Sequence, residues 1–123
     1  MKKIAFSMVF LAVIVLFAGS EKVSAQSGSM DWDGTVDDTV QIIIRGRNAV
    51  TNTLKGSVTY DARYNFNGRL PRDNVRVRVD KNDGRGKVYV VQQPNRRNNW
   101  TAIIQIVDEK RSRDRYSITV YWD

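Results

Sequence analysis

The residues that could do chemistry are few, because the chain of 123 residues contains neither histidine nor cysteine. Catalysis by Ser-His-Asp or Cys-His groups, imidazole or thiolate metal ligands, a histidine pH switch and disulfide bonds are therefore excluded for this chain. No serine lies in a glycine-flanked elbow of the kind that activates a nucleophile. We accordingly expect no cofactor and no enzymatic activity.

Acidic residues are dense in one segment, 31–38, which holds Asp31, Asp33, Asp37 and Asp38. Clustered carboxylates are the oxygen ligands that calcium prefers, and paired carboxylates are what glycoside hydrolysis needs. The segment lacks the complete Asp-x-Asp-x-Asp-Gly pattern and the later Glu of an EF-hand loop. The four aspartates are therefore candidate calcium ligands, or the acids of a small hydrolase. The alternative is that Asp37 or Asp38 makes a turn and pairs with an arginine.

Arginine dominates the positive charge of the chain. The first 25 residues carry three of the 20 basic and one of the 13 acidic residues, so the remainder has 17 and 12, a net charge of +5. Thirteen of these 17 are arginine, whose planar guanidinium binds carboxylate or phosphate through two parallel hydrogen bonds. This composition favours a polyanionic partner, such as an acidic polysaccharide or a phosphorylated glycolipid. The alternative is a well-solvated surface, because acidic residues are mixed among the arginines.

Four arginines form the candidate binding strip, namely Arg76, Arg78, Arg96 and Arg97. Arg76 and Arg78 are two residues apart in an alternating segment, so they project from one face of a predicted strand. Lys87 and Tyr89 are their expected neighbours across a hairpin. The alternative is an edge strand whose charges prevent aggregation.

Tryptophan offers a second kind of ligand contact. Trp32, Trp100 and Trp122 could stack on sugar rings, although tryptophan also fills the cores of β-sandwiches. Trp122 continues an alternating apolar row that begins at Tyr116, so we assign it to the core. Trp32 and Trp100 lie beside predicted turns and remain candidates for sugar stacking. Aromatic residues do not alternate with the arginines as stacking on nucleic acid requires, so nucleic acid is disfavoured as a partner.

The elements that must position these side chains are β-strands, because apolar residues recur with a period of two rather than 3.6. Turn residues such as Asn82-Asp83-Gly84 separate the strands at the spacing of an all-β sandwich. The fold class is therefore a single-domain antiparallel β-sandwich of seven to eight strands over residues 31–123. The expected strands are 31–36, 39–46, 48–54, 56–66, 74–80, 86–93, 99–107 and 115–122.

Two segments, 87–91 and 102–107, are apolar on both faces, so they are central strands or their outer face meets a partner. The last four strands resemble a meander. This order places the connections 80–87 and 108–115, with mixed charges, at one end of the sheet. The other end would carry Arg96 and Arg97, joined by Arg69 and Arg72, against Asp73. Neither end is therefore expected to be strongly basic.

The N-terminus has the layout of a secretory signal peptide. Met1-Lys2-Lys3 is basic, residues 4–18 are an apolar run, and small residues precede a cut after Ala25. The run is shorter than the ~20 apolar residues of a membrane-spanning helix. We expect residues 1–25 to be removed and residues 26–30 to form a disordered leader. The mature protein would then be periplasmic or extracellular, with no transmembrane segment.

Several short motifs extend over most of the mature chain. They are Trp32-x-Gly34-x-Val36-Asp37-Asp38, Ile44-Arg45-Gly46, Leu70-Pro71-Arg72, Gly84-Arg85-Gly86 and Gln92-Gln93-Pro94. In these motifs the chain resembles small secreted bacterial all-β proteins with no assigned function. The resemblance implies a secreted single-domain product and adds no site. Similarity to immunoglobulin-like sandwiches is architectural only, because the Cys…Trp…Cys spacing is absent.

The sequence therefore predicts a non-catalytic exported binding or structural module whose partner is a protein or an envelope polymer. One variant is recognition by strand addition at an open sheet edge. The alternative is a polyanion- or glycan-binding protein that uses its arginine-rich surface. The second alternative is the small carboxylate-dependent hydrolase. Salt separates the first two, because polyanion binding weakens steeply as ionic strength rises.

Overall fold

Eight strands and one short helical turn make up the computed structural model, which describes residues 27–56, 58–108 and 113–123. The elements are β1 (Gly28–Val36), β2 (Thr39–Arg45), β3 (Asn48–Lys55), β4 (Val58–Asn67), β5 (Val77–Asp83), β6 (Lys87–Gln92), η1 (Arg96–Asn98), β7 (Ala102–Val107) and β8 (Asp114–Trp122). The predicted all-β class and the predicted number of strands are confirmed.

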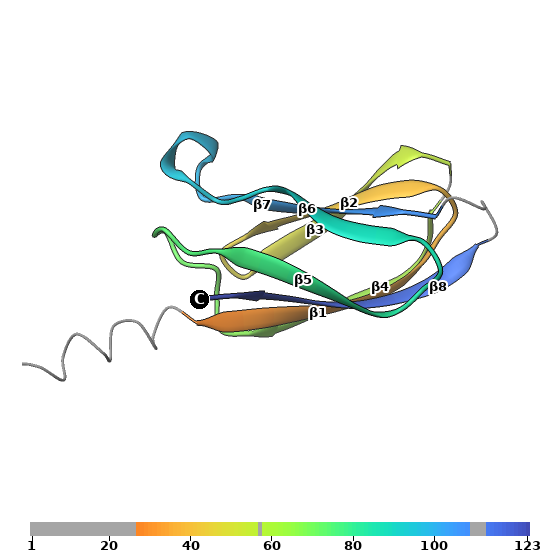
Figure 1. Ribbon diagram of the computed structural model, residues 1–123, viewed down its shortest axis with the longest axis horizontal. Coiled ribbons are helices and arrows are strands. Elements are labelled where there is room, and N and C mark those ends of the chain that lie inside the picture. Colours follow the sequence, from red (N-terminus) through yellow and green to blue (C-terminus); the bar gives the residue numbers. More distant parts are fainter. Residues whose placement is uncertain (1–26, 57, 109–112) are drawn as a thin grey trace, which may run out of the picture.

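The strands form two antiparallel four-stranded sheets packed face to face (Figure 1). Sheet A has the order β4-β1-β8-β5, and sheet B has the order β3-β2-β7-β6. Four connections cross between the sheets, joining β1 to β2, β3 to β4, β5 to β6 and β7 to β8. Among the described strands, only β2–β3 and β6–β7 are hairpins within one sheet. This arrangement is the β-sandwich that the alternating pattern predicts.

The predicted meander of the last four strands is wrong, because β5 and β8 belong to sheet A while β6 and β7 belong to sheet B. A period of two fixes which side chains of a strand face the core, and it is the same in both sheets. The pattern therefore could not distinguish a hairpin within one sheet from a crossing between two. Arg78 on β5 and Tyr89 on β6 consequently lie on different sheets and are not cross-strand neighbours, contrary to the prediction.

The core is filled by the inward-facing row of each strand, and its largest side chains are Trp32, Trp122 and Tyr116. The assignment of Trp122 to the core is confirmed. Trp32 joins it, and its indole N–H donates to Thr51 Oγ1 of sheet B at 3.1 Å. The indole also covers Gly34, where a Cβ would lie 2.6 Å from the ring. Trp32 is therefore not available for stacking on a sugar.

Of the predictions about the N-terminus, the structure bears only on residues 27–30. The predicted signal peptide, residues 1–25, lies outside the described residues, so export stays a prediction. β1 begins inside the predicted leader 26–30, because Gly28, Ser29 and Met30 pair with the last residues of β8. In the described part of the chain, no helix has the length and hydropathy needed to cross a membrane.

Candidate functional site

The four candidate aspartates lie in two separate places. Asp31 and Asp33 project outward from β1, and Asp31 Oδ1 accepts a hydrogen bond of 2.8 Å from Thr119 Oγ1. Asp37 and Asp38 form the connection between β1 and β2 at one end of the sandwich. Over residues 27–56, 58–108 and 113–123, no three acidic side chains lie close enough to hold a metal ion. The structure therefore does not assemble the four aspartates as a calcium site requires.

Asp37 and Asp38 share a hollow of about 390 Å³ with Lys55 and Gly56. Asp38 Oδ1 accepts a hydrogen bond of 2.8 Å from Thr39 Oγ1, and a Cβ at Gly56 would lie 2.7 Å from the Cβ of Asp38. Lys55 also lines this hollow, and its positive charge disfavours a metal cation there. These contacts are those of a tight turn, as the alternative interpretation of the sequence predicted, while the pairing of Asp37 or Asp38 with an arginine stays a prediction.

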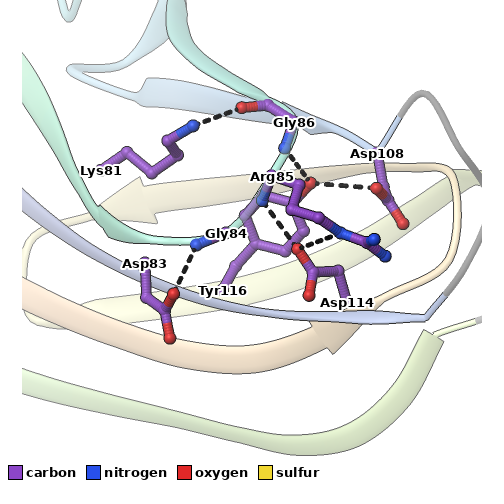
Figure 2. A network of polar contacts seen from close by, with 8 residues as sticks. All are labelled: Lys81, Asp83, Gly84, Arg85, Gly86, Asp108, Asp114 and Tyr116. Atoms are coloured by element: carbon purple, nitrogen blue, oxygen red, sulfur yellow. Dashed lines mark hydrogen bonds and ion pairs between the residues drawn. The ribbon is translucent and has the colours of Figure 1, made fainter.

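A second group of polar side chains surrounds the hydroxyl of Tyr116, at the end where β5 crosses to β6 (Figure 2). The hydroxyl accepts a hydrogen bond of 2.6 Å from Gly86 N and donates one of 3.2 Å to Asp108 Oδ1. Asp114 accepts a hydrogen bond of 2.7 Å from Arg85 N, and its carboxylate lies 3.3 Å from Arg85 Nε. The sequence did not single out this group, because its members come from three distant segments.

The centre of this group, Tyr116 and Asp108, is buried and therefore not accessible to a ligand. Tyr116 is 0% and Asp108 is 1% exposed. Burial, together with the neighbouring carboxylates, outweighs the Gly86 N–H and raises the pKa of Tyr116 from 10.0 to about 12, so its hydroxyl stays protonated to a higher pH than that of a solvated tyrosine. Burial disfavours the charge of Asp114, but the hydrogen bonds and the positive charge of Arg85 outweigh it and lower the pKa of Asp114.

A cavity of about 720 Å³ lies at the opposite end of the sandwich. Three connections that are far apart in the sequence supply its lining, namely Arg45, Gly46, Arg47 and Asn48; Arg69, Leu70, Pro71 and Arg72; and Asn99 and Trp100. Four of these ten residues are arginines, and none is acidic. We call this feature the arginine cavity.

Hydrogen bonds between the connections fix the shape of the arginine cavity. Leu70 N donates to Gly46 O at 2.9 Å, which joins the β4–β5 connection to the β2–β3 turn. Gly46 has a φ of 64°, and a Cβ there would lie 3.3 Å from Arg69 Nη2. Arg45 Nε donates to Thr101 Oγ1 at 2.9 Å, which joins β2 to the β6–β7 connection. Because Leu70 and Thr101 are buried, the frame of the cavity is part of the packed core.

The four guanidinium groups of the cavity are open to solvent. Within the described residues, none of the four is ion paired. Asp73 directly follows Arg72, but it is not a lining residue, and its carboxylate accepts a hydrogen bond of 2.7 Å from Asn74 N. Like charges repel one another, so an anion that enters the cavity relieves this repulsion and gains charge-assisted hydrogen bonds.

The arginine cavity belongs to a basic end of the sandwich, where the β4–β5 and β6–β7 connections and the C-terminal residue lie together, at the left of Figure 1. The arginines of this basic end are Arg45, Arg47, Arg69, Arg72, Arg76, Arg78, Arg96 and Arg97, and its described carboxylates are Asp73 and Asp123. At the opposite end, positive and negative residues are close to equal in number in the described segments.

The prediction that neither end is strongly basic is therefore wrong. It included Arg69, Arg72, Arg96 and Arg97 but omitted the β2–β3 turn, which adds Arg45 and Arg47. The position of this turn could have been predicted from the order of the strands. Strands that run alternately up and down place every second connection at the same end of the sandwich. The β2–β3, β4–β5 and β6–β7 connections are related in this way.

The predicted binding strip lies at the basic end but does not line the cavity. Arg76 precedes β5, and its backbone N–H and C=O both pair with the backbone of Asp123. Arg78 Nη1 lies 3.6 Å from Asp123 Oδ1. Arg96 and Arg97 lie exposed on η1. All four extend the positive charge around the cavity, and Arg78 is the one whose charge is partly neutralised.

The outer face of sheet B is the other feature that could meet a partner. The exposed large apolar residues of the described chain are Val50 and Leu54 on β3, and Tyr89 and Val91 on β6, with exposed fractions of 40 to 57%. These strands are the two edges of sheet B. The sequence indicated an apolar outer face for 87–91, and the exposure of Tyr89 and Val91 agrees with it.

The edge of β5 is partly closed to strand addition. The side chain of Gln93 accepts a hydrogen bond of 2.8 Å from Val77 N and donates one of 2.8 Å to Val77 O. These are the two backbone bonds that an added strand would make at that position. Strand addition at the beginning of β5 would therefore have to displace Gln93.

Comparison with known proteins assigns no identity to the chain. No protein-family model, no curated protein and no solved structure matches it. The resemblance to small secreted bacterial proteins accordingly stays a prediction.

Proposed function

We propose that the protein is a non-catalytic module that binds an anionic polymer at the arginine cavity. One observation carries this proposal. Arg45, Arg47, Arg69 and Arg72 meet from two connections at one solvent-open cavity that has no acidic lining residue. Guanidinium groups bind carboxylate and phosphate through two parallel hydrogen bonds, which a lysine cannot do.

The surroundings of the cavity favour a polymer over a small ion. The other arginines of the basic end continue the positive charge beyond the cavity rim. A field of this extent attracts a chain of repeated negative groups and accelerates its association. The predicted signal peptide supports an envelope or extracellular polymer as the source of those groups.

A panel of three polyanions tests the proposal: polygalacturonate, poly-L-glutamate and inorganic polyphosphate. The variant Arg47→Ser with Arg72→Ser removes two exposed guanidinium groups for which the structure gives no hydrogen bond. Each charge-assisted hydrogen bond contributes about 1.5–3 kcal/mol, so this variant should weaken binding by about ten-fold or more. Calorimetric titration at several salt concentrations should also give a shallower dependence of affinity on salt.

The matched control is Arg63→Ser with Arg115→Ser. Both residues are exposed on the strands of sheet A, away from the cavity, and this variant changes the net charge by the same amount. The control should bind the polyanions almost as well as the unmodified protein. An equal loss in both variants would show that only the overall charge attracts the polymers. That result, or no binding of any of the three at low salt, would contradict the proposal.

Recognition through the outer face of sheet B is the second candidate, because the exposed apolar residues of the described chain gather there. The variant Val50→Ser with Val91→Ser separates it from the first. Polyanion binding at the arginine cavity predicts that this variant binds the three polymers with unchanged affinity. If it lost binding while Arg47→Ser with Arg72→Ser kept it, the site would lie on sheet B.

A further inference from the structure

The lining of the arginine cavity is not only cationic. Besides its four arginines, the lining includes two residues with side-chain amides, Asn48 and Asn99, as well as Trp100 and Pro71, whereas its Leu70 is buried. A polymer whose groups are all charged, such as polyphosphate, has no ring face to stack on an indole and no hydroxyl groups to pair with amides. A ligand that carries charged groups, hydroxyl groups and an apolar ring face could use all three kinds of lining.

The cavity also has the volume of a small-molecule site. Its volume of about 720 Å³ lies within the ~300–1,000 Å³ that is usual for sites of organic ligands. A single inorganic anion would fill only a small part of this space. A unit with a ring, held by several contacts at once, is a better match for the cavity.

Trp100 occupies an unusual backbone conformation beside the cavity. Its φ is 57°, and that of the preceding Asn99 is 59°. The left-handed region is disfavoured for every residue that carries a Cβ, and it is rare for bulky ones. Such a conformation persists only where the surrounding structure imposes it, and it is commonest at functional sites.

The β6–β7 connection imposes this conformation through its own hydrogen bonds. Trp100 N donates to Asn95 O at 2.8 Å, and Thr101 N donates to Asn98 Oδ1 at 3.0 Å. Asn95 and Asn98 also cap η1 reciprocally, which makes the connection a closed unit. The hydrogen bonds of this connection therefore hold Trp100 beside the cavity, where the residue is half-buried.

We infer that the arginine cavity binds the acidic sugar units of an anionic polysaccharide, with Trp100 as the ring-stacking residue. This inference rests on the proposed function and narrows its ligand class. The guanidinium groups hold the carboxylate groups of the polymer, the amides of Asn48 and Asn99 hydrogen-bond to its hydroxyl groups, and the indole packs against a sugar ring. Trp100 is then the residue that distinguishes a sugar polymer from other polyanions.

The test compares polygalacturonate with poly-L-glutamate, which carries carboxylates but no ring. At equal salt and equal carboxylate concentration, the unmodified protein should bind polygalacturonate about ten-fold more tightly, in line with the energy of stacking on an aromatic side chain. The variant Trp100→Ala should lose this preference and keep its affinity for poly-L-glutamate. Trp100→Tyr, which keeps a ring, should retain most of the preference.

The variant Trp100→Gly is the control for folding. Glycine relaxes the backbone at this position, so this variant should have the circular dichroism spectrum of the unmodified protein. Equal affinity for the two polymers, with the arginine dependence intact, would overturn the saccharide inference and leave the proposed function standing. No binding of either polymer would overturn the saccharide inference, and if polyphosphate did not bind either, the proposed function would be overturned as well. Tighter binding of oligothymidylate than of polygalacturonate would replace the sugar by a nucleobase as the stacking partner and would also overturn the inference.

Discussion

Tyr116 shows how a single side chain joins the two sheets at the end away from the arginine cavity. It projects from β8 of sheet A, and its hydroxyl meets Gly86, which precedes β6, and Asp108, which follows β7. Both of these neighbours belong to the ends of sheet B strands. Loss of the hydroxyl would leave a partly buried N–H and a buried carboxylate without this partner, which costs more than the hydrogen bonds themselves contribute.

Replacement of Tyr116 by Phe should therefore lower the free energy of unfolding by about 1–3 kcal/mol. The measurement is urea denaturation at neutral pH. Tyr121→Phe is the matched control, because Tyr121 lies on the same strand but faces outward. It should change the free energy of unfolding by only a few tenths of a kcal/mol. Equal effects of the two substitutions would show that the buried hydroxyl has no special role.

The same hydroxyl predicts a dependence of stability on alkaline pH. The pKa of Tyr116 is raised from 10.0 to about 12 in the folded protein, so folding favours the protonated form. Its contribution is complete below pH 10 and is lost as pH rises through 12. The stability difference between the unmodified protein and Tyr116→Phe should therefore shrink between pH 10 and 12. A difference that stays constant over this range would contradict the assignment.

Among the elements, the crossing from β5 to β6 depends most on glycine. Gly84 and Gly86 both lie against Tyr116, and a Cβ at either position would overlap its side chain. Gly84 also has a φ of 125°, which side chains rarely permit. The motif Gly84-Arg85-Gly86 is therefore required by packing, because the backbone must pass directly over the tyrosine ring to reach the other sheet.

Substitution of Gly84 by Ala should destabilise the protein by roughly 3 kcal/mol or more, because strain and overlap with the core add together. Gly68→Ala is the control, since Gly68 has a positive φ of 93° but its nearest neighbour would lie 3.6 Å from the new Cβ. That change should cost about 1 kcal/mol. The two melting temperatures give the comparison, and equal shifts would mean that contact with Tyr116 is unimportant.

The individual strands could be predicted from the sequence, but their assignment to sheets could not. Alternation in segments such as 116–122 identifies both the strand and its buried row, and the structure buries Tyr116, Ile118, Val120 and Trp122 accordingly. Which strand pairs with which depends on where the chain crosses between sheets. Such a crossing is fixed by contacts like that of Gly86 with Tyr116, which join residues 30 positions apart.

For the whole molecule, the distribution of charge matters more than its total. The basic end concentrates arginines, the opposite end mixes signs, and sheet B carries the exposed apolar residues. Arg69, Arg72, Arg96 and Arg97 could be placed at one end from the sequence. Arg45, Arg47 and Trp100 could not be assigned to one cavity, because their proximity depends on the packing of three connections.

The most direct test of the account is to map the binding surface with backbone amide chemical shifts while galacturonate oligomers are added. The account predicts that the largest changes occur at Gly46, Leu70 and Trp100, which come from the three connections around the arginine cavity. Changes confined to Tyr89 and Gln105 of sheet B, or to the Tyr116 end of the sandwich, would contradict it. Saturating oligomer that shifts no amide at the cavity would do the same.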